Sequence, residues 1–157
     1  MQSYHRTLTK SKPKSNFLSI NSDNCFMSLK VILKPCPAWG CILCNKSPNA
    51  KIFLFGFSQG AMIALHYGLR DEESFGGILA FSGSLISPER LSEIKNRTPV
   101  MLVHGEIDEV VPFSEMIKAS KALEQNGINI EKYSAPNLGH GIDDYGIKRA
   151  LEFMKKK

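Results

Sequence analysis

Hydrophobic residues after residue 50 fall into two alternating patterns. Short continuous apolar runs alternate with segments in which apolar residues recur at helical spacing. The runs predict strands over 51–55, 76–81, 99–104 and 128–133, and the helical segments predict helices over 61–70, 89–96, 113–126 and 143–156. Strands that alternate with helices of this length predict an α/β fold with a mostly parallel sheet of about four strands, flanked by helices.

Residues 1–50 lack both patterns. Ser, Asn, Lys and Thr dominate the first 24 residues, which favours loop or disorder, and a strand is weakly indicated only over 29–33. We therefore expect an atypical, poorly structured N-terminal segment, 1–50, followed by one folded domain, 51–157. A chain of 157 residues is long enough to bury a core in a single domain.

The net charge of +5 is unevenly distributed. Residues 1–50 hold seven Lys or Arg and one acid, whereas the remainder holds 13 basic and 14 acidic residues. Because the predicted domain is nearly neutral, the charge does not favour nucleic acid as a partner. No apolar run is long enough for a membrane span or a signal peptide, so we expect no stable membrane insertion and a cytoplasmic location.

All four cysteines lie in the N-terminal segment, at Cys25, Cys36, Cys41 and Cys44. The last three have a C-x4-C-x2-C spacing that can serve zinc or an iron–sulfur cluster. A fourth ligand at a recognised spacing is missing, so reduced thiols are the favoured interpretation and no metal is predicted. A metal-binding module appended to the domain stays an alternative.

The segment between the first predicted strand and helix carries the main chemical signal. Gly56-Phe57-Ser58-Gln59-Gly60 is a Gly-x-Ser-x-Gly pentapeptide, with a buried strand before it and a helix after it. This context is typical of a nucleophile elbow, a turn so tight that small residues must flank the exposed serine. Ser58 is therefore the candidate nucleophile.

A serine nucleophile needs an imidazole to accept its proton and a carboxylate to orient that imidazole. Asp108 lies in the loop after the strand 99–104, and His140 lies in the loop after the strand 128–133. Loops after parallel strands emerge at the same edge of a sheet, so both side chains can reach Ser58. The chain order Ser, Asp, His is that of α/β hydrolases.

The segments GFSQGA, HGEIDEVVP and GHGI, in this order and each after a strand, resemble the carboxylesterase, phospholipase and acyl-protein thioesterase family of α/β hydrolases. The resemblance covers residues 51–156. It implies that Ser58 is the nucleophile, Asp108 the acid and His140 the base, and that the backbone N–H of Gln59 is one oxyanion donor. It also implies hydrolysis of a small acyl ester or thioester without a cofactor.

Other polar residues near these segments have simpler interpretations. Glu106 and Glu109 flank the acid position, and Asp143 with Asp144 favours the start of the last helix. His66 and His104 are expected to be structural, and Ser82 and Ser84 to line the site or support it.

The family's N-terminal half is not apparent in residues 1–50. A complete sheet has strands before the elbow strand, and a loop after one of them, usually with His-Gly, supplies a second oxyanion donor. We therefore expect a truncated or frame-disrupted hydrolase with one exposed edge on the strand 51–55, through which it could self-associate. The alternative is a catalytically inactive remnant that lacks this donor and half of the sheet.

Overall fold

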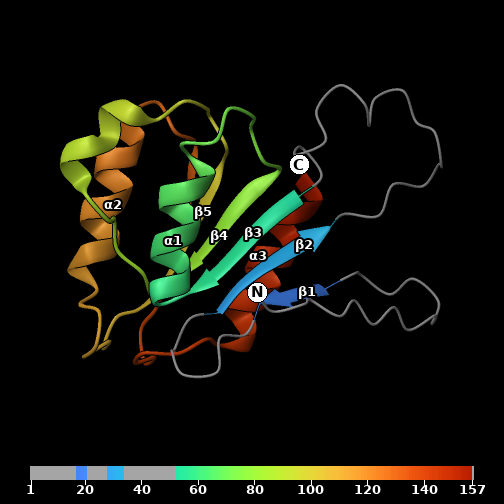
Figure 1. Cartoon of the computed structure of the whole chain (residues 1–157). Helices are drawn as coiled ribbons and strands as arrows, with labels where there is room; N and C mark the ends of the chain where they lie inside the picture. The colour runs from blue at the N-terminus through green and yellow to red at the C-terminus, as the bar shows by residue number, and fades with distance from the viewer. Residues whose placement is uncertain (1–16, 21–27, 34–51, 157) are drawn as a thin grey trace, which may run out of the picture.

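The computed structural model describes residues 17–20, 28–33 and 52–156, with six strands in one sheet and helices on both of its faces (Figure 1). The strands follow the sheet in chain order: β1 (Phe17–Ile20), β2 (Ser28–Leu33), β3 (Ile52–Phe57), β4 (Gly77–Phe81), β5 (Val100–Gly105) and β6 (Ile130–Ala135). The helical elements are α1 (Gln59–Gly68), the 3-10 helix η3 (Pro88–Glu93), α2 (Ser114–Gln125) and α3 (Asp144–Lys156).

The predicted α/β fold class is confirmed. Strands β3, β4, β5 and β6 are mutually parallel, and the four predicted strands and three of the four predicted helices after residue 50 are present with ends shifted by a few residues. Strand β6 lies at one edge of the sheet and is largely half-buried, as its alternating sequence predicts. The segment predicted as a helix over 89–96 is instead a short 3-10 helix that ends at Glu93.

Two stretches of the N-terminal segment are described, and both are strands. The weakly indicated strand over 29–33 is present as β2, and β1 lies in a stretch for which a loop or disorder was expected. Both strands are antiparallel to their neighbours, with β2 paired along the whole of β3. The edge of β3 is therefore covered by β2, and the edges of the described sheet are β1 and β6.

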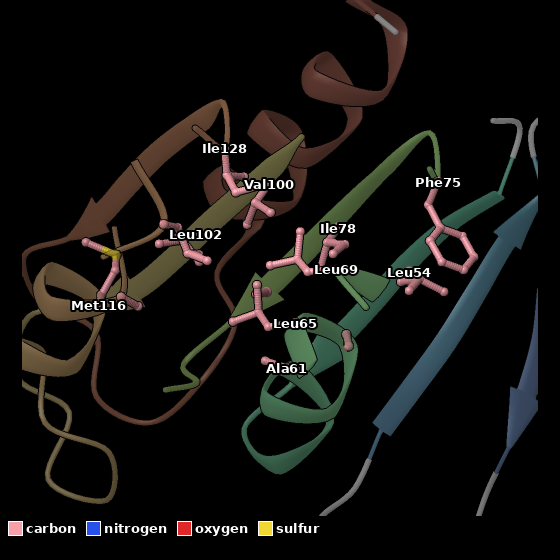
Figure 2. Packing of buried hydrophobic residues seen from close by; sticks show 14 residues of the cluster. Leu54, Ala61, Leu65, Leu69, Phe75, Ile78, Val100, Leu102, Met116 and Ile128 are labelled. Atoms are coloured by element: carbon pink, nitrogen blue, oxygen red, sulfur yellow. The ribbon is translucent and has the colours of Figure 1, made fainter. Parts of the chain in front are cut away.

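The two faces of the sheet have separate hydrophobic cores. Helices α1 and α2 lie on one face, where Leu65 and Met116 pack with Leu54, Ile78 and other strand residues (Figure 2). Helix α3 lies on the other face and contributes Ala150 and Phe153 to a cluster with aromatic and aliphatic residues of β3, β4 and β5 (Figure 1). Alternate residues of β3, β4 and β5 therefore supply the two cores.

The parallel strands place three loops at one edge of the sheet. Ser58 directly follows β3, Asp108 lies three residues after β5, and His140 lies five residues after β6. Ser82, the residue directly after β4, lies at the same edge. Since the carboxyl ends of parallel strands meet at this edge, residues far apart in the sequence become neighbours.

Among the described residues, no helix is both long and apolar enough to cross a membrane.

Candidate active site

Ser58 occupies a strained turn between β3 and α1. Its backbone has φ 54° and ψ −122°, a conformation that costs a non-glycine residue about 1–3 kcal/mol. Hydrogen bonds hold this geometry: the Ser58 N–H donates to the Phe81 carbonyl at 2.8 Å, and the Ser58 carbonyl accepts from Ala61 N–H at 3.0 Å. A Cβ atom on Gly56 would lie 2.3 Å from the Gly60 carbonyl oxygen, so the turn requires glycine there.

Asp108 is held in a cradle of backbone N–H groups. Its Oδ1 accepts hydrogen bonds from the N–H groups of Val110 and Val111, both at 2.9 Å, and the residue is only 7% exposed. Burial raises the pKa of Asp108, but hydrogen bonds from His140, Val111 and Val110 outweigh it, so the net pKa lies below its ordinary value. The carboxylate form is therefore favoured.

The loop that carries His140 rests against the end of β5. The Ile107 N–H donates to the Leu138 carbonyl at 3.2 Å, which joins this loop to the Asp108 loop. The imidazole of His140 lies beside the Phe57 ring, with ring centroids 4.9 Å apart. The backbone bond at Leu138 and the neighbouring Phe57 ring thus both restrict His140.

Asp143 fixes the far end of the same loop, as expected for a residue at the start of the last helix. Its Oδ1 accepts from the Gly146 N–H at 2.8 Å, which caps α3, and its Oδ2 accepts from the Tyr133 hydroxyl at 3.1 Å. The carboxylate therefore links β6 to α3 on either side of the loop.

Ser58, His140 and Asp108 form one hydrogen-bonded line. His140 Nδ1 lies 2.8 Å from Asp108 Oδ2, and His140 Nε2 lies 3.0 Å from Ser58 Oγ. Because a carboxylate can only accept, the imidazole proton belongs on Nδ1, which leaves Nε2 free to accept from the serine hydroxyl. This is the arrangement in which a histidine can take a proton from serine.

The other predicted residues lie around this line. Gln59 is the exposed first residue of α1, directly after Ser58, where its backbone N–H belongs to the first turn of the helix. Glu106 and Glu109 are exposed, whereas Asp108 between them is buried. His66 lies on α1, away from the end of the helix that starts at the elbow.

Two further residues contact the site: Ser82, which was expected to line or support it, and His104, which was expected to be structural. Ser82 has φ 48°, and its hydroxyl donates to the carbonyl of Gly141, next to His140, at 3.4 Å. His104 Nε2 lies 3.3 Å from Asp108 Oδ2. Each lies at the carboxyl end of a parallel strand. This position was the feature of the sequence that could have predicted a contact with the site.

No group of three or more potential metal ligands is found among the described residues. The four cysteines considered as ligands all lie outside them, so the metal-binding alternative stays a prediction.

A Ser–His–Asp line at the carboxyl edge of a parallel sheet defines an α/β hydrolase. Comparison with known proteins gives the family: residues 40–157 match the Phospholipase/Carboxylesterase family. The chain belongs to this family.

Three similar proteins illustrate the match. Acyl-protein thioesterase 1 of Saccharomyces cerevisiae is 39% identical over 113 residues, which are 68% of this chain and 49% of the relative. Acyl-protein thioesterase 1 of Aspergillus fumigatus is 32% identical over 114 residues, 68% of this chain and 47% of the relative. The crystal structure of esterase PE8 is 38% identical with a TM-score of 0.67, covering 73% of this chain and 54% of the other. The chain spans about half the length of the relatives it matches.

Proposed function

We propose that the protein hydrolyses carboxylic esters or thioesters through an acyl-enzyme on Ser58. The observation that carries this proposal is the continuous line from Ser58 Oγ through His140 to Asp108, with distances of 3.0 and 2.8 Å. Membership of the Phospholipase/Carboxylesterase family and the esterase and thioesterase relatives support the same class of reaction.

The chemistry follows from the order of these groups. His140 Nε2 accepts the hydroxyl proton as Ser58 Oγ attacks the acyl carbonyl, and Asp108 stabilises the imidazolium. The protonated His140 then donates this proton to the leaving alcohol or thiol. Water repeats the sequence on the acyl-enzyme: its proton passes to His140 and its oxygen attacks the carbonyl, which releases the acid and restores Ser58.

The backbone N–H of Gln59 is the proposed donor to the oxyanion, because it follows the nucleophile at the start of α1. A single missing oxyanion donor typically costs about 10² to 10³ in rate. The rate of hydrolysis by this protein thus depends on whether a second hydrogen-bond donor to the oxyanion is present beside the N–H of Gln59.

Exposed apolar residues on the loops that carry Asp108 and His140 favour an apolar acyl group. Ile107 and Val110 flank Asp108 and are 60% and 68% exposed, and Ile142, two residues after His140, is 40% exposed. Exposed apolar residues on the loops of a site are typical of a binding surface for an apolar ligand, and these three residues are called the apolar rim.

The test is labelling by a fluorophosphonate probe and turnover of a short p-nitrophenyl ester. We expect wild type to react and Ser58→Ala to lose both signals, whereas Ser114→Ala, at an exposed serine of α2, keeps them. Labelling that survives in Ser58→Ala would exclude Ser58 as the nucleophile. A folded wild-type protein that neither labels nor turns over would support the inactive alternative.

Cytoplasmic location, the absence of nucleic-acid partners and self-association through a sheet edge stay predictions from the sequence. The edge predicted to be exposed, that of the strand 51–55, is the edge of β3, which is paired with β2 along its whole length in the described sheet.

A further inference from the structure

His104 is a buried imidazole that the proposed reaction does not use. It is the second-last residue of β5, is 1% exposed, and its ring packs edge-on against Phe113 with centroids 6.1 Å apart. A strand interior usually holds an apolar residue at such a position, so the polar ring atoms need a reason to be there.

The contacts of His104 Nε2 explain why a polar ring is buried here. Nε2 lies 2.8 Å from the Val111 carbonyl oxygen and 3.3 Å from Asp108 Oδ2. Since both partners are oxygens that accept, Nε2 must carry a proton, which donates mainly to Val111 and also faces the carboxylate. The bond from His104 to Val111 closes the loop that contains Asp108.

Both oxygens of Asp108 are thereby restrained. Oδ1 accepts hydrogen bonds from the backbone N–H groups of Val110 and Val111, and Oδ2 lies 2.8 Å from His140 Nδ1 and 3.3 Å from His104 Nε2. The hydrogen bond from His104 holds Val111, and Val111 holds Oδ1, so the imidazole supports the carboxylate through the backbone as well as directly.

We propose that His104 is a positioning residue for the reaction: it locks the Asp108 loop so that Oδ2 stays aligned with His140. This inference rests on the proposed function for its kinetic consequence. The restraint on Asp108 itself does not depend on activity. Misplacement of a reacting group by about 1 Å can cost about 10²-fold in rate.

The kinetic experiment compares His104→Leu with His104→Gln, whose side-chain amide can still donate near the position of Nε2. We expect His104→Leu to lower kcat and the rate of fluorophosphonate labelling about 10- to 100-fold, with KM changed less than about twofold. We expect His104→Gln to recover most of the loss. Equal losses in both variants, or no loss in a folded His104→Leu, would overturn the proposal.

Thr98→Val is the matched control for general destabilisation. Thr98 is buried just before the opposite end of β5, and its hydroxyl oxygen accepts from the Phe75 N–H at 2.9 Å. Its removal leaves a buried N–H unpaired and weakens the fold at a distance from the carboxylate. If Thr98→Val reduces kcat as much as His104→Leu does, the effect is one of stability and the proposal fails.

Amide hydrogen exchange separates this inference from the proposed function. We expect the N–H groups of Val110 and Val111 to exchange about tenfold faster in His104→Leu and near the wild-type rate in His104→Gln. This pattern in a folded protein that does not label with the probe would leave the restraint on Asp108 intact and refute the hydrolase proposal. Unchanged exchange in His104→Leu would refute the positioning role.

Discussion

Gly105 touches the loop that carries His140 so closely that no side chain fits between them: a Cβ atom on Gly105 would lie 2.1 Å from the Leu138 carbonyl oxygen. Real Cβ contacts do not come this close, so the β5 backbone and the loop can meet only because residue 105 is glycine. The position of His140 beside Asp108 thus depends on a residue that takes no part in the chemistry.

Gly105→Ala is expected to displace the His140 loop and slow fluorophosphonate labelling about 10²-fold. Gly139→Ala is the matched control, because a Cβ atom there would find its nearest atom, the Ile107 carbonyl oxygen, 3.8 Å away. Labelling rates of the two variants and wild type, with circular dichroism to verify folding, measure the difference. Equal rates for Gly105→Ala and wild type would show that the loop adapts without moving the imidazole.

The sequence was sufficient to predict the parallel half of the sheet and the convergence of Ser58, Asp108 and His140. The reason is that the local patterns agreed with one another. Apolar runs predicted the strands, and the loops after β3, β5 and β6 each carried one residue of the Ser–His–Asp line. Their catalytic roles stay predictions, because proximity shows what the groups can do rather than what they do.

Two kinds of feature could not be predicted in this way. Strand β1 has four residues in a polar stretch, too few to show a period, and it is defined by its pairing with β2. The contacts of His104 depend on how the loop after β5 folds back, and local sequence does not reveal a bond to a carbonyl seven residues on. The presence of β1 and the contacts of His104 both depend on backbone geometry between residues that are distant in the sequence.

Ser58 stores backbone strain that a glycine would release. We expect Ser58→Gly to be more stable than Ser58→Ala by about 1 kcal/mol, because relief of about 1–3 kcal/mol exceeds the entropy cost of glycine of about 0.5–1 kcal/mol. Urea unfolding of both variants measures this difference. At Ser120, inside α2, the sign should reverse, with glycine less stable than alanine by about 1 kcal/mol. If the glycine variant were less stable than the alanine variant at both positions, the result would argue against strain at Ser58.

The apolar rim predicts that the protein prefers esters with a long acyl chain. Ile107→Ser should raise KM for p-nitrophenyl octanoate about fivefold through loss of about 1 kcal/mol of apolar contact, and leave KM for the acetate nearly unchanged. Leu151→Ser, on α3 and similarly exposed at 53%, is the control and should change neither value. An equal effect of Ile107→Ser on both esters would mean that the rim does not contact the acyl chain.

The lowered pKa of Asp108 predicts how stability depends on pH. Because the pKa of the folded state lies below the unfolded value of about 3.9, the carboxylate stabilises the fold fully above that value, and this contribution is lost as the pH falls through the folded pKa. We therefore expect the difference in unfolding free energy between wild type and Asp108→Asn to be largest at pH 7 and to shrink below about pH 4. Urea titrations across this range measure it, with Thr98→Val as a non-titrating control whose difference should stay constant. A difference for Asp108→Asn that grows on acidification would mean that burial, which raises the pKa, outweighs the hydrogen bonds from His140, Val110 and Val111.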